Sequence, residues 1–324
     1  MLKVAIIGGE THIGEITALA GTALQIVGAC VRPDQREWAQ VTLGATVFDA
    51  VDRLLDETAP DLVAVANEND LKASAVLTAL RAGCDVVVDK PLAITATEQA
   101  QIESFLHTHP ERRLLMLLTL RGNGEYSALR EMVRSGEIGT TAFVEVRMAV
   151  QLKRAQRPPW FLDVNRSGGL FLDLLIHGLD QVEWITGQQI TALTGVTGNL
   201  GVPDDENLRD HAAVFCELSG GGSAIVEGQR MLPGTVGSDY RVTVAGTEGF
   251  ADLRLGKGVT VSSPEGADVP PANVPEAQSV VADWLRAPDA ETCLVPQSAS
   301  LRANHLAILA TQSAFERRRI AVEA

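Results

Sequence analysis

The feature that most constrains this chain is the alternation, from residue 1 to about residue 120, of short apolar runs with helix-length amphipathic segments. The runs that we expect to be strands are Lys3–Ile7, Gln25–Cys30, Leu62–Ala66, Asp85–Val88 and Leu114–Leu118. Helical segments such as Lys72–Ala82 and Ala96–His107 lie between them. Continuous apolar strands joined through helices form a parallel sheet that is covered on both faces. The pattern therefore predicts a doubly wound α/β domain, which binds its ligands at the carboxyl ends of the strands.

The pattern changes beyond about residue 122. One helix, Tyr126–Ser135, is followed by strand-like segments at Ala142–Val150, Ala212–Leu218, Ser223–Gln229, Arg241–Val244 and Ala251–Leu255. Gly220-Gly221-Gly222 is typical of a hairpin turn, and the proline-rich stretch Ser263–Pro275 is expected to be a surface loop. Strands joined by short turns indicate an antiparallel sheet, so we expect an α+β domain over 122–324 after an α/β domain over 1–121.

Composition excludes several classes of partner. The 324 residues are enough for two domains, and 46% hydrophobic with 21% charged residues is typical of a globular protein. Forty-one acidic against 27 basic residues give a net charge of -14, which would repel nucleic acid and anionic membranes. The first apolar run, up to Ile7, is too short for a signal segment or a membrane span. We therefore expect a cytoplasmic protein that binds neither nucleic acid nor membranes.

A glycine-rich loop, Gly8-Gly9-Glu10-Thr11-His12-Ile13-Gly14, follows the first predicted strand and precedes a helical segment. Small residues there let the backbone approach a pyrophosphate, whose charge is held by amides at the helix start. A Gly-x-Gly-x-x-Gly pattern would need glycines at 8, 10 and 13, whereas this chain has them at 8, 9 and 14. The loop is therefore interpreted either as a dinucleotide-binding loop or as a plain strand-to-helix turn.

The end of the second predicted strand bears on which dinucleotide would bind. Val31 stands where an NAD enzyme usually carries an acidic residue for the adenine ribose. Arg32 follows directly and Arg36 lies one helical turn on, and an arginine there can accommodate the 2′-phosphate of NADP. The sequence favours NADP over NAD, with solvated surface arginines as the alternative.

A lysine follows the predicted strand Asp85–Val88, in the segment Asp89-Lys90-Pro91. Proline fixes the turn because it cannot extend a sheet ladder, so Lys90 is expected to point from a rigid backbone at the ligand edge. An exposed lysine after a strand is the ordinary alternative.

The segment after Gly168-Gly169 places three ionisable residues on one face of an apolar helix. Asp173, His177 and Asp180 fall at i, i+4 and i+7. Burying them is costly unless they pair, and the ordinary histidine pKa of about 6.5 suits proton transfer near neutral pH. A surface Asp/His pair and a core histidine are the alternatives. No His-Glu-x-x-His helix is present, so no metal is expected.

Taken together, these segments resemble the Gfo/Idh/MocA family of oxidoreductases over essentially the whole chain. Asp89-Lys90-Pro91 is similar to the family's Glu-Lys-Pro motif, and Asp173, His177 and Asp180 match its Gly-Gly-x-x-x-Asp-x-Gly-x-His-x-x-Asp helix, with Leu175 replacing a glycine. Further similarities are Ser135–Gly139, Trp160 and Ala245–Gly249. Departures are the irregular glycine loop, Val31, and Asn67-Glu68-Asn69 followed by Leu71-Lys72 where the family often has Thr-Pro-Asn and then Leu-His.

The resemblance implies a Rossmann domain followed by an α+β domain with a large open, mostly antiparallel sheet. It also implies an NAD(P)-dependent dehydrogenase or reductase acting on CH–OH groups of a sugar, cyclitol or related polyol, assembled as a homodimer or homotetramer. Lys90 would stabilise negative charge on the substrate oxygen, His177 would take the hydroxyl proton, and Asp173 would orient His177.

By the same resemblance, two sets of residues would bind the ligands. The cofactor-binding set is Gly8, Gly9, Thr11, His12, Ile13, Arg32, Asn67, Asn69, Asp89 and Lys90. The substrate-binding set is Lys90, Arg121, Trp160, Asp173 and His177.

Two other functions remain open at this point. One is a catalytically silent regulatory protein that binds a nucleotide or ligand without turnover, which the irregular loop favours and the retention of Lys90, Asp173 and His177 disfavours. The other is a glycoside hydrolase that uses bound NAD for transient oxidation, which would show no net redox change.

Overall fold

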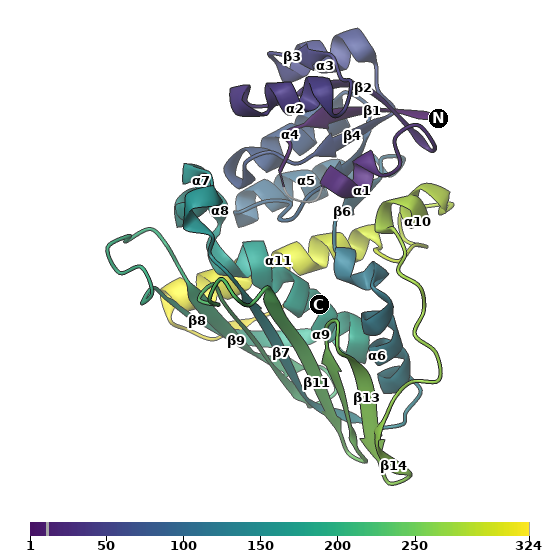
Figure 1. The fold of residues 1–324 in the computed structure, drawn as a ribbon, viewed down its shortest axis with the longest axis vertical. Helices are drawn as coiled ribbons and strands as arrows, with labels where there is room; N and C mark the ends of the chain where they lie inside the picture. Colours follow the sequence, from purple (N-terminus) through teal and green to yellow (C-terminus); the bar gives the residue numbers. More distant parts are fainter. Residues whose placement is uncertain (11–12, 324) are drawn as a thin grey trace. The chain divides into compact units, whose positions relative to one another are not determined.

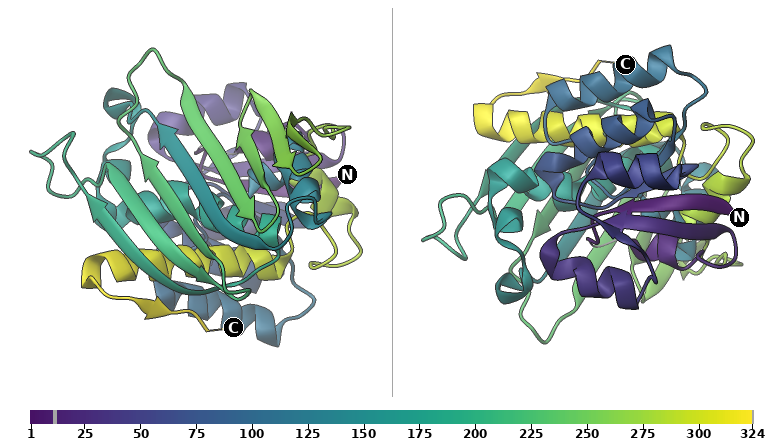
Figure 2. Two further views of the ribbon diagram at one scale, coloured as in Figure 1. Left: turned by 90° about the horizontal axis from the view of Figure 1, so that it is seen from below. Right: turned by 90° about the horizontal axis from the view of Figure 1, so that it is seen from above.

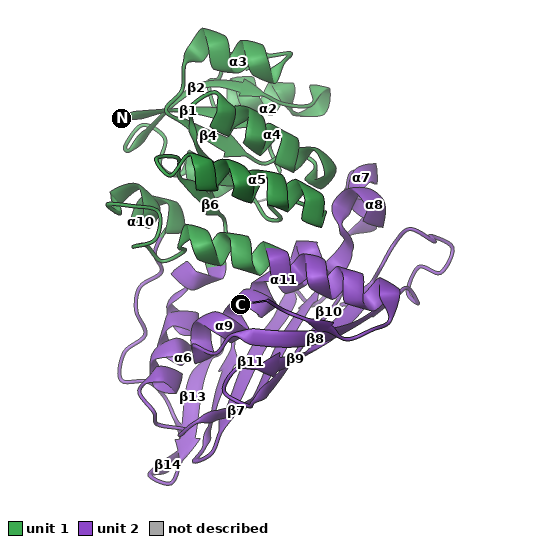
Figure 3. Ribbon diagram, turned by 180° about the vertical axis from the view of Figure 1, so that it is seen from behind, with its two compact units in different colours: residues 1–119, 279–304 green, residues 120–278, 305–324 purple. Residues whose placement is uncertain are grey.

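The computed structural model describes residues 1–10 and 13–323. It divides into two compact units, shown in different colours in Figure 3. Unit 1 comprises Met1–Thr119 and Ser279–Asn304, and unit 2 comprises Leu120–Gln278 and His305–Ala324. The chain thus crosses between the units three times, so the expected single boundary after residue 121 leaves out the return of 279–304 to unit 1.

Unit 1 is built on a six-stranded parallel sheet with the order β3-β2-β1-β4-β5-β6 (Figure 1). Its strands are β1 Leu2–Ile7, β2 Leu24–Cys30, β3 Val47–Phe48, β4 Leu62–Val65, β5 Asp85–Val88 and β6 Leu114–Met116. The predicted parallel sheet is confirmed. The strand order reverses between β1 and β4, and such a switch point is where doubly wound sheets bind ligands.

The helices of unit 1 connect these strands. They are α1 Gly14–Thr17, α2 Arg36–Val41, α3 Val51–Thr58, α4 Asn69–Arg81 and α5 Ala96–Thr108, with the short turn η2 Pro33–Gln35 before α2. The start of α5 follows from its sequence, because Thr95 and Glu98 form a capping box that satisfies two backbone donors. By contrast, α1 is a single turn, although it follows the glycine loop.

The segment that returns to unit 1 contains α10 Val280–Arg286 and the first half of α11 Gln297–Glu316. It is held by Asn304, whose side chain is fully buried. The side-chain oxygen Oδ1 of Asn304 accepts a hydrogen bond from the Leu92 backbone amide at 2.8 Å. The side-chain nitrogen Nδ2 donates to Ala93 O at 3.1 Å and to Gln99 Oε1 at 2.8 Å. One side chain thereby joins α11 to the segment that follows β5.

Unit 2 is built on a nine-stranded sheet with the order β14-β13-β12-β11-β7-β10-β9-β8-β15. Its strands are β7 Thr141–Val150, β8 Ile190–Gly198, β9 His211–Leu218, β10 Ser223–Gln229, β11 Ser238–Gly246, β12 Phe250–Arg254, β13 Gly258–Ser263, β14 Gly266–Val269 and β15 Ile320–Ala321. The predicted mostly antiparallel sheet is confirmed, with β7 and β10 as a parallel pair. The expectation of a loop over Ser263–Pro275 was wrong in part, because β14 pairs with β13 there.

Helices cover one face of this sheet. Buried and partly exposed residues alternate along β10, as expected for a sheet with one packed face, and α6 Gly124–Arg134 packs on β12 and β13. Helix α9 Ile176–Thr186 packs on β7 and β10, where a Cβ on Gly178 would overlap Val226. Gly178 is therefore the residue that lets this helix lie so close to the strands. The left view of Figure 2 shows the strands face on, with no helix in front of them.

Two further features concern the whole chain. All four cysteines are free thiols, and Cys84 and Cys216 are buried. Within the described ranges, no helix combines the length and the apolar character that crossing a membrane requires.

We predict that Asn304→Ala destabilises the protein, because it leaves the Leu92 amide and the Gln99 side chain without their buried partner. A loss of about 2 kcal/mol would lower the midpoint of thermal unfolding by roughly 4–8 °C. Thermal unfolding followed by circular dichroism measures this, with the exposed Asn273→Ala as the matched control. Equal midpoints for the two variants would contradict the anchoring role of Asn304.

Candidate functional site

The carboxyl edge of the parallel sheet in unit 1 brings together the loops after β1 and β4. Gly8 follows β1 with φ at +78°, and a Cβ on it would overlap the carbonyl of Ala66, which follows β4. Only glycine adopts this conformation readily and leaves room for the neighbouring backbone. The Glu10 amide donates to Ala66 O at 2.9 Å, so the two loops are joined at the switch point. Gly8 and Glu10 therefore form a close backbone cradle with Ala66, although the glycine spacing is irregular.

Asn67 lies beside this cradle and presents an acceptor. Its Oδ1 atom is buried and accepts no hydrogen bond from the described residues, and an atom of this kind marks a place for a donor. The cradle at Gly8 and the acceptor at Asn67 fit a nicotinamide dinucleotide. Of the other loop residues, Gly9 packs against the Trp38 ring and Ile13 is buried at the start of α1. Thr11 and His12 lie outside the described residues.

A fully buried lysine lies below the same edge. Lys72 on α4 is 1% exposed, and its ammonium donates to Asn69 Oδ1 at 3.0 Å and to the carbonyl of Lys90 at 3.2 Å. Burial lowers the pKa of Lys72 to about 8, against the attraction of Asp89. The sequence marks Lys72 only as a replacement for a family histidine. Its burial and its link to Lys90 come from the packing of α4 on β4 and β5.

Lys90 follows β5 and is itself nearly buried, at 8% exposure. The Lys90–Pro91 peptide bond is cis, and the amide of the preceding Asp89 donates to Val65 O at 2.8 Å. Asp89 is 4% exposed. The structure thus brings Gly8, Asn67, Asn69, Asp89 and Lys90 to one edge of the sheet, and the predicted roles of all five stay predictions.

The two arginines expected to favour NADP are engaged in ion pairs. The Arg32 guanidinium pairs with Glu10, with Asp34 at 3.1 Å and with Glu68 at 3.6 Å. Arg36 pairs with Asp49. The residues that sequence reasoning missed here are Glu10 and Glu68, since no pattern of spacing connects them with Arg32.

In unit 2, the helix that carries Asp173 and His177 differs from the prediction of one continuous α-helix. Its first turn, η5 Phe171–Leu175, is a π-helix that leads into α9. Asp173 lies in this π turn, and His177 lies in the first turn of α9. Asp173 pairs with Arg230, whose side chain is 4% exposed and stacks over the Phe161 ring. Arg230, which follows β10, is a second residue that the sequence did not identify.

Asp180 forms a buried, bidentate ion pair with Arg121. Arg121 in the turn η3 Thr119–Gly122 donates to its two carboxylate oxygens at 3.0 and 2.7 Å. His177, 7% exposed, lies on α9 one turn before Asp180, and Trp160 is buried in α7 Pro159–Leu162. The guanidinium of Arg121 is thus committed to Asp180, and substrate binding by Arg121 and Trp160 stays a prediction.

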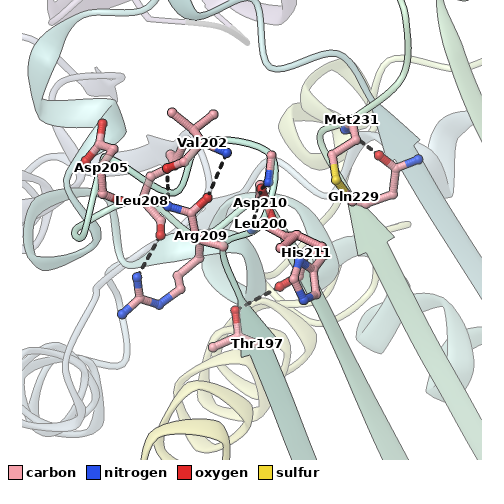
Figure 4. A network of polar contacts seen from close by, with 12 residues as sticks. Thr197, Leu200, Val202, Asp205, Leu208, Arg209, Asp210, His211, Gln229 and Met231 are labelled. Atoms are coloured by element: carbon pink, nitrogen blue, oxygen red, sulfur yellow. Dashed lines mark hydrogen bonds and ion pairs between the residues drawn. The ribbon is translucent and has the colours of Figure 1, made fainter.

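A polar network at the start of β9 fixes the backbone next to Arg230 (Figure 4). Asp210 is 1% exposed, accepts the amides of Leu200 and Gly201, and lies 2.6 Å from Nδ1 of His211. Burial opposes the charge of Asp210, but these hydrogen bonds lower its pKa. Because the Arg230 amide donates to the Asp210 carbonyl at 2.8 Å, the network also holds the residue that pairs with Asp173.

Possible metal ligands do not form a cluster in the described part of the chain. Within residues 1–10 and 13–323, no three His, Cys, Asp or Glu side chains gather closely enough to hold a metal ion.

Comparison with known proteins identifies both parts of the chain. Residues 2–116 match the family model described as "Oxidoreductase family, NAD-binding Rossmann fold", and residues 126–252 match the "GFO/IDH/MocA C-terminal domain". These matches define an oxidoreductase with an NAD-binding Rossmann domain. The chain belongs to the Gfo/Idh/MocA family.

Two curated relatives are named inositol 2-dehydrogenases. The chain is 27% identical to an inositol 2-dehydrogenase of Leifsonia xyli over 66% of this chain and 60% of that protein. It is 25% identical to an inositol 2-dehydrogenase of Rhizobium meliloti over 81% of this chain and 78% of the relative. The first alignment therefore spans less than two thirds of the relative.

Solved structures share the whole fold. Myo-inositol 2-dehydrogenase from Lactobacillus plantarum superposes with a TM-score of 0.80 at 23% identity, covering 99% of each chain. GenD2 from gentamicin A biosynthesis, in complex with NAD, gives a TM-score of 0.82 at 21% identity, covering 100% of this chain and 97% of the other. At these identities the likeness establishes the fold.

The buried Lys72 generates a pH-dependent prediction. Its pKa falls from 10.5 to about 8 on folding, so between these values the unfolded chain binds more protons and stability rises with pH. Lys72→Met removes the contribution of Lys72 to this pH dependence of stability. We expect the stability of the variant relative to wild type to decrease by about 3 kcal/mol between pH values near 7 and near 10.

Urea unfolding of both proteins at the two pH values measures this change. The exposed Lys3→Met serves as the control, and its stability difference from wild type is expected to stay constant with pH. A difference for Lys72→Met that is equally independent of pH would show that this ammonium carries no burial cost.

Proposed function

We propose that this protein is an NAD(P)-dependent oxidoreductase that transfers a hydride between a nicotinamide cofactor and a CH–OH group of a sugar, cyclitol or related polyol. Its membership of the oxidoreductase family and the inositol 2-dehydrogenases among its relatives support this class of substrate.

The observation that carries the proposal is the burial of the two basic side chains Lys90 and His177. Each is less than a tenth exposed, and each lies on a segment held by neighbouring backbone contacts. Basic groups that are nearly buried and rigidly positioned are typical of proton-transfer sites. Lys90 shares its sheet edge with the Gly8 cradle and Asn67, which fit the cofactor.

In this proposal the residues take the roles implied by the family. The bound nicotinamide supplies the hydride chemistry. The ammonium of Lys90 donates a hydrogen bond to the substrate oxygen and stabilises negative charge there. His177 takes the hydroxyl proton in the direction of oxidation and returns it in the direction of reduction.

Asp173 would orient His177, and Asp173 is itself paired with Arg230. Because Arg230 pairs with the Asp173 carboxylate, that carboxylate is itself held in place and its charge is balanced. We therefore include Arg230 as a positioning residue of the proposed site.

The finer expectations from the sequence stay predictions. The uncovered face of the nine-stranded sheet supports the expected homodimer or homotetramer, since its outward residues include the exposed Phe215 and the paired charges Arg147 and Glu227. A cytoplasmic location also stays a prediction. The preference for NADP rests on Arg32, and the ion pairs of Arg32 count against it.

The proposal is tested by incubating the purified protein with NAD⁺ or NADP⁺ and a panel of inositols, aldoses and glucosides, and following reduced nicotinamide by absorbance. Formation of reduced cofactor with at least one polyol supports the proposal. Release of a leaving group from an activated glycoside without net reduction would indicate a hydrolase instead.

A catalytically silent binding protein is the second candidate, and the shortness of α1 favours it. Four helical residues, Gly14–Thr17, offer a weak dipole to a pyrophosphate. Binding of a nucleotide without turnover on any polyol would favour this alternative.

We predict that His177→Asn lowers kcat by roughly 10²–10⁴-fold, because it removes the proton acceptor while keeping a side chain of similar size. The affinity for reduced cofactor, measured by nicotinamide fluorescence, is expected to stay within about twofold of wild type. The exposed His107→Asn is the matched control and should leave kcat unchanged. Retention of full activity by His177→Asn would remove His177 from the mechanism.

A further inference from the structure

Three charged residues from three loops meet at the carboxyl edge of β2, β1 and β4. Arg32 follows β2, Glu10 follows β1, and Glu68 follows β4 and precedes α4. The side chains of Glu10 and Glu68 are only 18% and 12% exposed, and both lie within ion-pair distance of the same Arg32 nitrogen. Counting these three side chains, the cluster carries one net negative charge, and the more exposed Asp34 adds to it.

The hydrogen-bonding groups at this cluster are mainly acceptors. Gln35 donates from Nε2 to Glu10 Oε1 at 3.0 Å, and the opposite end of the amide, Oε1, is buried and accepts no hydrogen bond from the described residues. The orientation of this amide is fixed chemically, because a carboxylate accepts hydrogen bonds only. This edge of the sheet therefore gathers two carboxylates and a buried carbonyl oxygen, all of which accept hydrogen bonds.

These properties suit the adenosine ribose of NAD and conflict with that of NADP. A 2′-hydroxyl can donate to a carboxylate or to an amide oxygen, as the acidic residue of NAD enzymes requires. A 2′-phosphate carries close to two negative charges and only acceptor oxygens. Within the cluster of Arg32, Glu10, Glu68 and Asp34, its attractive partner would be Arg32, whose guanidinium already holds Glu10 and Glu68.

We propose that Glu10, supported by Glu68, determines cofactor specificity by occupying Arg32 and accepting the ribose 2′-hydroxyl, so that this Rossmann unit selects NAD(H) over NADP(H). NAD enzymes usually carry an acidic residue after the second strand, where this chain has Val31. In this proposal Glu10, in the glycine loop, replaces that acidic residue. The inference rests on the proposed function in requiring that the unit binds a nicotinamide dinucleotide.

The experiment is a fluorescence titration of the full-length protein with NADH and, separately, with NADPH, which needs no turnover. Wild type is expected to bind NADH at least tenfold more tightly than NADPH. Glu10→Gln keeps the size of the side chain and releases Arg32, so the ratio should fall at least fivefold, mainly through tighter NADPH binding. Glu68→Gln should shift the ratio in the same direction by a smaller factor.

Two controls separate charge from general disruption. Glu57→Gln removes a half-exposed glutamate that pairs with Arg53 on α3, and it should leave the ratio unchanged. Higher salt screens charges, so raising the ionic strength should reduce the discrimination in wild type and have less effect in Glu10→Gln. Circular dichroism establishes that each variant is folded, and Glu68→Gln provides the test if Glu10→Gln is not.

The outcomes are distinguishable. Tighter binding of NADPH by wild type, or an unchanged ratio in both glutamate variants, overturns the inference and leaves the proposed oxidoreductase function standing. Failure to bind either nucleotide, with none released on denaturation, overturns the proposed function and the inference with it.

Discussion

The parallel pairing of β2, β1, β4 and β5 is the constraint on which the proposed cofactor site depends. In a parallel sheet all carboxyl ends lie at one edge, so residues far apart in the chain must meet there. Gly8, Arg32, Asn67 and Lys90 each follow a different strand of this set. The strands need only be apolar and continuous to pair, which leaves the residues after them available for ligand chemistry.

Buried charge is the second organising feature, and it is balanced in each unit separately. In unit 1 the Lys72 ammonium donates hydrogen bonds to Asn69 and to the Lys90 carbonyl, and the negative charge of Asp89 stabilises it. In unit 2 two arginines that are distant in sequence, Arg121 and Arg230, hold Asp180 and Asp173. Such groups lower stability unless they are paired, so their presence in otherwise apolar elements is typical of functional sites.

The candidate site departs from its family mainly where the cofactor would bind. The glycine spacing and Val31 depart from the family pattern, and α1 is a single turn. Glu10 and Gln35 supply acceptors from other positions, and the Gly8 backbone retains its close approach to Ala66. From the sequence alone, Arg32 favours NADP, whereas its ion pairs with Glu10 and Glu68 count against that preference. The role of a charged residue therefore depends on the charged residues around it as well as on its position in the motif.

The parallel sheet, the mostly antiparallel second sheet and the candidates Lys90, Asp173 and His177 could all be predicted from the sequence, because apolar periodicity and ordered motifs are local properties of the chain. The sequence did not determine the return of residues 279–304 to unit 1, the π turn at Phe171–Leu175, or the partners of Arg32, Asp173 and Lys72. Most of those features depend on contacts between residues that are distant in the sequence, from 18 positions for Lys72 and Lys90 to 212 for Leu92 and Asn304. The π turn depends on a choice between helical forms that this pattern of residue types did not distinguish. Only the folded chain decides which charges lie within reach of one another, because that choice is made by the packing of whole strands and helices.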